Sequence, residues 1–193
     1  MTRSFHFGHP VVRTVDALGE RLARTTRGVP QADRVLYTLS EAGNHSAIWH
    51  SINLVDATVG AAVTNARGGD GARRRRNAFR RSAVLLCEQV AVNGLVKSRF
   101  RRTRPETVDE HPHDLRTPRT SSFPSGHASA GACSATMLSA DLGAAPLWWL
   151  LAAGVAWSRV HVGAHHTSDV LGGITIGRLV GRVAVAIWPG RGR

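Results

Sequence analysis

Length, composition and charge limit the partners that this chain can have. Its 193 residues include 25 lysines and arginines against 13 aspartates and glutamates, a formal net charge of +12 that suits phosphate, phospholipid or nucleic acid. No internal repeat is present and no aromatic residues interleave with the basic ones, so we expect one domain, residues 1–193, and no nucleic-acid partner.

The predicted elements are helices along the whole chain. Residues 11–26 place apolar side chains at helical spacing with arginines opposite, which is typical of an amphipathic helix. This helix either lies at a membrane surface or packs on the other helices, and we assign residues 1–43 to a peripheral segment. Strand signals are weak, so the expected fold class is all-α, a bundle of about five to six helices in residues 44–193. Further helices are predicted over residues 47–64, 83–97, 127–142, 146–160 and 169–188.

Two cations precede a proline in the first of three short blocks that can carry chemistry, residues 97–105. The sequence KSRFRRTRP separates Lys97 from Arg104 by about two helical turns, so both can project from one face before Pro105 disfavours the helix. Two fixed cations would then point at one anion.

The second block, residues 124–127, reads as a turn into a helix. Pro124, Ser125 and Gly126 are turn or cap residues, and His127 opens a helical run rich in small residues. Free amides at such a helix start bind phosphate oxygens. This block therefore predicts further ligands for an anion.

The third block, residues 158–169, combines a histidine with a carboxylate. His165 and Asp169 stand at i and i+4, which makes them neighbours on a helix surface. The carboxylate can accept one ring N–H and leave the lone pair of the other nitrogen directed outward. That arrangement makes a histidine nucleophilic.

Together the three blocks resemble the signature of the type 2 phosphatidic acid phosphatase family, also called the lipid phosphate phosphatase and vanadium haloperoxidase superfamily. Three blocks in order are far more specific than any one of them, although the N-terminal third resembles the family only loosely. The resemblance implies an acid phosphatase/vanadium haloperoxidase-like bundle. The matching residues are Lys97, Arg104 and Pro105; Pro124, Ser125, Gly126 and His127; and Ser158, Arg159, His165 and Asp169.

The resemblance also implies a role for each side chain. His165 is the expected nucleophile, which forms a phosphohistidine, and Asp169 fixes its tautomer. His127 is the expected general acid, which protonates the leaving alkoxide and then activates water. The other residues form a phosphate cage whose cations replace a metal ion, so no metal and no cofactor are expected. The cage residues are Lys97, Arg104, Ser125, Gly126 and Arg159.

A metal site is the alternative for the histidines. His161, His165 and Asp169 follow one another at i, i+4 and i+8, which is also metal-ligand spacing, and His127 could supply a fourth ligand. A metal site would leave the cations of the three blocks unexplained.

Other charged residues near the blocks match no signature position. His111 and His113 are assigned to a loop over the site. The extra arginines are interpreted as surface charge that attracts or steers an anionic substrate. They are Arg99, Arg101, Arg102, Arg116 and Arg119.

Membrane insertion is expected from internal segments, because the start of the sequence lacks the apolar stretch of a signal peptide. The most apolar run, residues 129–157, is divided by Asp141 and Pro146 into helices near the lower limit for spanning a bilayer. Charges inside would-be spans argue against insertion unless they are paired. They are Asp56, Glu88, Arg178 and Arg182. The resemblance favours an integral, multi-pass protein of the cell membrane, in contact with membrane lipids.

Orientation is predicted from the arginine-rich stretch RGGDGARRRRNAFRR, residues 67–81, interpreted as the linker between the second and third helices. The positive-inside rule makes such a linker cytoplasmic, which places the three blocks on the periplasmic or exterior side. A nucleic-acid patch over residues 73–76 is disfavoured because no stacking aromatics accompany it.

The expected activity is metal-independent hydrolysis of a lipid phosphate, either phosphatidic acid or a polyprenyl phosphate or diphosphate. Two rival classes stay open. One is a vanadate-dependent haloperoxidase, which the short chain argues against. The other is a non-catalytic membrane protein that binds anions or lipids, which the complete signature argues against. The sequence names neither the lipid nor the oligomeric state.

Overall fold

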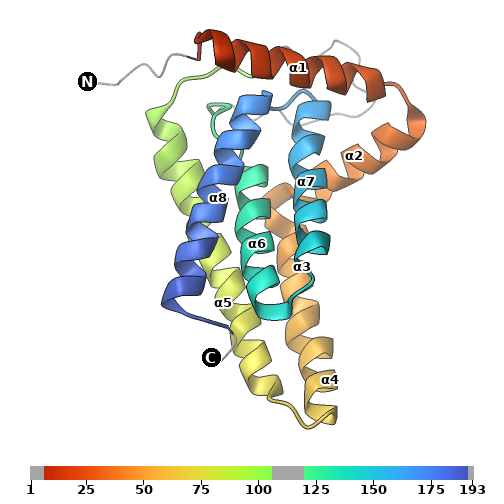
Figure 1. Ribbon diagram of the computed structural model, residues 1–193, viewed down its shortest axis with the longest axis vertical. Helices are drawn as coiled ribbons and strands as arrows, with labels where there is room; N and C mark the ends of the chain where they lie inside the picture. The colour runs from red at the N-terminus through yellow and green to blue at the C-terminus, as the bar shows by residue number, and fades with distance from the viewer. Residues whose placement is uncertain (1–6, 106–119, 191–193) are drawn as a thin grey trace.

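The computed structural model describes residues 7–105 and 120–190, and all regular elements within them are helical. Helix α1 (Pro10–Thr26) lies across one end of the molecule, over the ends of the upright helices (Figure 1). The predicted all-α class is confirmed. The other helices are α2 (Pro30–Ala42), α3 (Ala47–Val55), α4 (Ala61–Ala66), α5 (Gly71–Val90), α6 (Gly126–Leu142), α7 (Ala145–His161) and α8 (Thr167–Ile187).

The two N-terminal helices pack directly on the bundle. Helix α1 contacts α7 and α8, and α2 contacts α7. The sequence analysis missed α2, although Pro30 at its first turn and Gly43 just after its last residue are ordinary start and stop signals.

Helix α6 lies at the centre of the bundle because small residues let its neighbours approach closely. Helix α8 turns Gly173 and Gly177 towards it. A Cβ added at Gly177 would lie 1.9 Å from the carbonyl oxygen of Ser129, and one at Gly173 would lie 2.4 Å from that of Ser125. Such close backbone packing fixes the start of α8 against the start of α6. The main apolar cluster joins α6 to α3, α5 and α7 and consists of Trp49, Leu85, Ala130, Ala135, Leu138, Ala152 and Val155.

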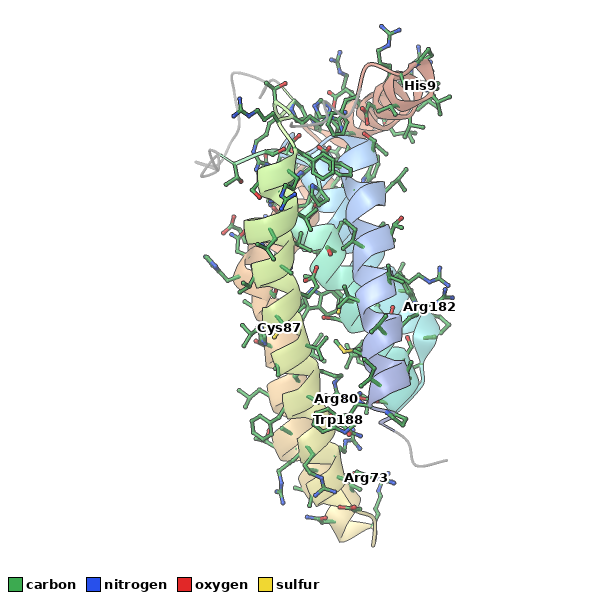
Figure 2. The ribbon with its side chains drawn as sticks, turned by 90° about the vertical axis from the view of Figure 1, so that its left-hand side faces the viewer. His9, Arg73, Arg80, Cys87, Arg182 and Trp188 are labelled. Atoms are coloured by element: carbon green, nitrogen blue, oxygen red, sulfur yellow. The ribbon has the colours of Figure 1, made fainter. Side chains whose placement is uncertain are left out.

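A long helical hairpin extends beyond the other helices at the end opposite α1 (Figure 1). Its first arm is α3, a π-helical turn (Asp56–Gly60) and α4, and its second arm is α5. The prediction that residues 67–81 form a linker is therefore wrong, because the Asp70 carboxylate caps α5 by accepting the amide of Arg73 at 2.7 Å. Arg73 and His9, which caps the start of α1, lie at opposite ends of the molecule (Figure 2).

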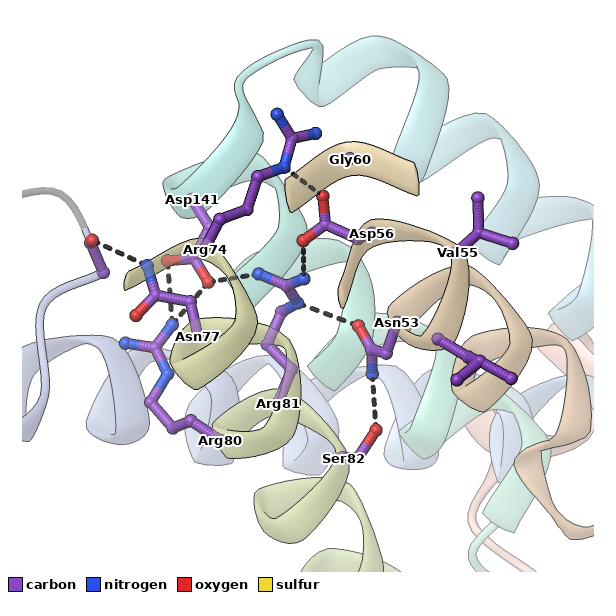
Figure 3. Close-up of polar contacts among 12 residues, drawn as sticks. Asn53, Val55, Asp56, Gly60, Arg74, Asn77, Arg80, Arg81, Ser82 and Asp141 are labelled. Carbon is purple, nitrogen blue, oxygen red and sulfur yellow. Dashed lines mark hydrogen bonds and ion pairs between the residues drawn. The ribbon is translucent and has the colours of Figure 1, made fainter. Parts of the chain in front are cut away.

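Buried ion pairs hold this hairpin to α6 (Figure 3). Arg81 donates to Asp56 at 2.5 Å and to Asp141 at 2.6 Å, and Arg80 donates to Asp141 at 2.6 Å. Arg74 donates to the other oxygen of Asp56 at 2.6 Å. The Asp56 that the sequence analysis counted as an objection to a membrane span is thus paired inside the protein.

Two of the other three charges that argued against membrane spans also have partners, and the third, Arg182, is exposed. The Glu88 carboxylate accepts hydrogen bonds from the Ser129 hydroxyl and from Gln89. The Arg178 guanidinium lies 5.5 Å from the centre of the Trp149 ring. Within the described residues, α8 is the helix that is long and apolar enough to cross a membrane by length and composition.

Candidate active site

The three sequence blocks meet at the end of the bundle that α1 covers (Figure 1). The first block follows the end of α5, the second begins α6, and the third runs from the end of α7 into the start of α8. Segments up to 72 residues apart in the sequence thus lie at one end of the molecule, because consecutive helices of the bundle run in opposite directions.

Lys97 and Arg104 do not lie on one helical face, so that prediction is wrong. The helical turn ends at Arg99, and Phe100 is extended. Arg104 instead reaches the third block: its Nη1 donates to the carbonyl oxygen of Ala164 at 2.7 Å and lies 3.5 Å from Nε2 of His165.

Ser125 starts α6 as predicted, with its side chain as the cap of the Ala128 amide. Its own amide donates to the carbonyl oxygen of Asp169 at 3.0 Å, which joins the second block to the third. A Cβ at Gly126 would lie 2.8 Å from Oδ1 of Asn93, so the helix start has no room for a larger residue.

His127 is held by α2 and the turn after it. Its Nε2 lies 3.2 Å from Oδ1 of Asn44, within hydrogen-bond distance. A Cβ at Gly43 would approach the His127 ring to 2.6 Å, so Gly43 makes room for the ring. The sequence analysis missed Asn44, since nothing in its local sequence points to a histidine 83 residues away.

His165 and Asp169 are close, but not as neighbours on one helix. Helix α7 ends at His161, His166 caps α8, and Asp169 is the third residue of that helix. Asp169 accepts the His166 amide at 2.9 Å, and its Oδ2 lies 3.7 Å from Nδ1 of His165. That distance exceeds a hydrogen bond, and Nδ1 is buried without a partner among the described residues.

Arg159 enters the site from the last turn of α7. Its Nη1 donates to the hydroxyl of Ser40 in α2, which orients the guanidinium. Its Nε is buried and has no hydrogen-bond partner in the described part of the chain. A donor of this kind is available to an anion.

Burial and the cations around the site set its protonation. Burial is the largest effect on His165, and with Arg159 and Arg104 it lowers the pKa of His165 to about 4, although Asp169 acts in the opposite direction. The imidazole is therefore neutral at neutral pH. Burial, Arg104 and Arg159 likewise lower the pKa of Lys97 to about 8. Lys97 thus keeps its charge at pH 7 and loses it in mildly alkaline solution.

The alternative metal-ligand set does not come together. His161 turns towards α1 and α2, where its ring nitrogens lie 2.8 Å from Asp33 and 3.1 Å from Thr26. Because α7 ends at His161, the i, i+4, i+8 spacing does not place His161 beside His165. In residues 7–105 and 120–190, no three His, Cys, Asp or Glu side chains are grouped as metal ligands would be.

Arg102 is not a surface charge, contrary to the prediction. Its side chain is 8% exposed and forms ion pairs with Asp16 and Asp169. Arg99 and Arg101 are exposed, as predicted. The other residues of this set, Arg116, Arg119, His111 and His113, lie outside the described residues.

A pocket of about 360 Å³ opens beside His165, between α1 and the start of α8. Polar side chains of α1 form one wall and the third block forms the other. The lining residues are Asp16, Ala17, Glu20, Arg24, Pro105, Val160, His165, His166 and Thr167.

Comparison with solved structures assigns the fold. The transmembrane PAP2-type phosphatidylglycerolphosphate phosphatase of Bacillus subtilis superposes with a TM-score of 0.72, covering 97% of this chain and 90% of that one. The sequences are 22% identical, so the likeness defines a shared all-helical fold.

Sequence comparison assigns the family. The PAP2 superfamily pattern matches residues 80–193, which is more than half of the chain. Decaprenylphosphoryl-5-phosphoribose phosphatase of Mycobacterium tuberculosis, in strains CDC 1551 / Oshkosh and ATCC 25618 / H37Rv, is 32% identical over 158 residues, 80% of each chain. The chain belongs to the PAP2 superfamily, as its three blocks predicted, and it is a lipid phosphate phosphatase.

Proposed function

We propose that the enzyme removes phosphate from a lipid phosphate through a phosphohistidine on His165. The observation that carries this proposal is the position of His165, a buried and neutral imidazole at the point where all three blocks meet. Its Nε2 lies next to Arg104 and its Nδ1 faces Asp169, so one nitrogen is directed to an anion and the other to a carboxylate. This is the polarity that a histidine nucleophile needs.

The first step forms the phosphoenzyme. Nε2 of His165 attacks phosphorus, the P–O bond to the leaving group breaks, and His127, in its imidazolium form, donates the proton on Nδ1 to the departing alkoxide while Nε2–H stays directed to Asn44. Asp169 stabilises the positive charge that develops on the His165 ring. We infer that Nδ1 and Oδ2 close from 3.7 Å to hydrogen-bond distance as that charge appears.

The second step returns the enzyme to its starting state. His127, now neutral, takes a proton from water, the water oxygen attacks phosphorus, and the P–N bond to His165 breaks. Inorganic phosphate leaves. Asn44 supports this role by holding the His127 ring in one orientation.

The phosphate cage that we propose combines three cations with a helix start. Lys97, Arg104 and Arg159 supply the charge that stabilises the equatorial oxygens, and this supports hydrolysis without a metal ion. The amide groups and the hydroxyl at the start of α6, from Ser125 and Gly126, add neutral donors.

The pocket beside His165 favours a substrate with a polar group next to its phosphate. Asp16 and Glu20 line the pocket beside Arg24, and although each is already paired with an arginine, their oxygens have lone pairs left to accept hydrogen bonds from hydroxyl groups. The Mycobacterium tuberculosis relative is named for a lipid-linked phosphosugar, which fits such a pocket. We therefore place a lipid-linked sugar phosphate ahead of phosphatidic acid and of polyprenyl phosphates or diphosphates as the substrate.

We also propose that the bundle spans the membrane several times, with the site at the periplasmic or exterior end. Leu54, Phe79, Leu150 and Leu179 are exposed on the outer sides of four helices, while Arg81, Asp56 and Asp141 are paired inside. Helix α8 has 21 residues. At about 1.5 Å per residue it is about 31 Å long, close to the roughly 30 Å of a hydrocarbon core. The exposed arginines of residues 67–76 lie at the far end of the hairpin and favour a cytoplasmic position there.

The test is phosphate release by the detergent-purified enzyme from a lipid-linked sugar phosphate, phosphatidic acid and a polyprenyl diphosphate, with and without chelator. Quenching with alkaline detergent after reaction with substrate labelled in its phosphate should trap a phosphoenzyme that is stable in base and labile in acid. His165→Ala should abolish both turnover and trapping. Full turnover by His165→Ala would remove the nucleophile assignment, and turnover abolished by chelator would favour a metal-dependent route.

A further inference from the structure

One guanidinium links α1 to the carboxylate that faces the proposed nucleophile. Nη1 of Arg102 donates to Oδ1 of Asp169 at 2.5 Å, and Nη2 donates to Oδ2 of Asp16 at 2.5 Å. All three side chains are largely buried, with 8% of Arg102, 15% of Asp16 and none of Asp169 exposed. An arginine can serve two carboxylates in this way because its donors form a rigid, planar fork.

Each carboxylate uses its other oxygen to hold the start of α8. Oδ1 of Asp16 accepts the amide of Ser168 at 2.8 Å, and Oδ2 of Asp169 accepts the amide of His166 at 2.9 Å. Arg102 also donates to the hydroxyl of Ser168 at 2.7 Å. The start of α8 is therefore fixed from two sides, and one side belongs to α1.

We propose that Arg102 is a positioning residue, which holds Asp169 in register with His165, and that Asp16 of α1 holds Arg102 in turn. This inference rests on the proposed function, because the position of Asp169 matters to turnover only if His165 carries the phosphate. Helix α1 lies outside the match to the PAP2 superfamily, which begins at residue 80. It becomes part of the active site through this contact.

The other cations at the site do not replace Arg102. Arg104 donates to the Ala164 carbonyl and Arg159 to the Ser40 hydroxyl, so both are oriented by groups other than Asp169. Arg102 is the cation for which a hydrogen bond to the Asp169 side chain is found among the described residues. Without it, a fully buried carboxylate would lose its charge partner, and its neutral, protonated form would be favoured.

The test compares Arg102→Gln with Arg101→Gln, since Arg101 is the exposed neighbour in the same segment. Both variants are assayed for kcat, KM and pH profile in detergent micelles, beside wild type and His165→Ala, with the lipid phosphate that wild type hydrolyses fastest among the three named above. Arg102→Gln should lower kcat on the order of a hundredfold with a smaller change in KM, as small misplacements of catalytic groups do. The acid limb of its kcat profile should move to higher pH, because Asp169 without its arginine partner has a higher pKa and ionises at higher pH. Arg101→Gln should match wild type.

Two further variants separate positioning from general structural support. Arg102→Lys keeps the positive charge but cannot donate to both carboxylates as the planar guanidinium does. It should recover part of the kcat lost in Arg102→Gln and return the acid limb to the pH of the wild type. Asp16→Asn keeps the shape and the acceptor for the Ser168 amide, and should lower kcat less than Arg102→Gln. The two losses should not add in the double variant, because both act through one contact. If Arg102→Gln does not fold, these two variants carry the test.

The outcomes distinguish this inference from the proposed function. A wild type that is inactive on all three lipid phosphates, or an active His165→Ala, would overturn the proposed function, and the inference with it. Suppose instead that His165→Ala is inactive, while Arg102→Gln has the same kcat and pH profile as Arg101→Gln. That result would overturn the inference and leave the proposed function standing. Additive losses from Asp16→Asn and Arg102→Gln would overturn the part assigned to α1.

Discussion

The ring of His127 and the side-chain amide of Asn44 meet across 83 residues, with 3.2 Å between Nε2 and Oδ1. An amide oxygen only accepts hydrogen bonds, so this contact favours the tautomer in which Nε2 carries the proton. It also fixes the plane of the ring. Asn44 therefore belongs with the proposed general acid.

The decrease in kcat on replacing His127 or Asn44 should depend on the leaving group of the substrate. His127→Ala should reduce kcat for an alkyl phosphate by roughly 10²–10⁴-fold, the usual contribution of a general acid. The loss for para-nitrophenyl phosphate should be smaller, because a nitrophenolate leaves without protonation. Asn44→Ala should show the same pattern with a smaller loss. Equal losses on both substrates would contradict the role given to His127.

The lowered pKa of Lys97 predicts an alkaline limit to phosphate binding. Its pKa is lowered from an ordinary value of 10.5 to about 8, so the ammonium is charged below that pH and is lost as pH rises through it. KM should therefore rise above about pH 8. Lys97→Arg keeps a charge at all these pH values, so its KM should stay flat over the same range. An unchanged alkaline limb in Lys97→Arg would assign that limb to another group.

Because α8 lies so close to α6, adding one methyl group at Gly177 should lower both the stability and the activity of the enzyme. In Gly177→Ala the new Cβ would lie 1.9 Å from a backbone oxygen, and overpacking of this kind costs about 1–3 kcal/mol or more of unfolding free energy. Because α8 carries Asp169, kcat should fall as well. Gly94→Ala is the matched control, since nothing lies within 4 Å of its added Cβ. Thermal unfolding in detergent and phosphate release report the two effects.

The buried ion pairs between the hairpin and α6 should stabilise the fold without affecting the chemistry. Asp141→Ala removes the shared partner of Arg80 and Arg81, whose side chains are 1% exposed, and should cost about 3–5 kcal/mol. Arg76→Ala, in a pair whose side chains are 63% and 51% exposed, should change stability by less than about 1 kcal/mol. Both variants should keep the wild-type KM at a temperature where they are folded. A raised KM in Asp141→Ala would mean that the network also supports the site.

The sequence was sufficient where local rules or residue chemistry decide the outcome. Helical spacing predicted a helix over residues 11–26, and the structure has it at Pro10–Thr26. The turn and cap residues predicted a helix from His127, and α6 begins one residue earlier, at Gly126. The three blocks were sufficient for the family, because the residue types that grip a phosphate are few and their order is specific.

Predictions from local sequence were wrong where contacts with distant segments determine the local structure. The arginine stretch looked like a linker, but the buried carboxylates of Asp56 and Asp141 accept its side chains and let α5 begin at Gly71. Helical spacing placed His161 beside His165, but the chain turns between them and His161 pairs with Asp33.

The sequence by itself determined the all-helical class, the family and the set of candidate site residues. Helical periodicity, cap residues and phosphate-binding residues can all be recognised from residues that lie close together in the chain. Only the tertiary structure decided that Asn44 meets His127 and that Arg102 lies between Asp16 and Asp169. The physical reason is that these partners lie far apart in the chain. Which of several arginines is buried depends on where α1 and α8 place their carboxylates, and no local pattern encodes that choice.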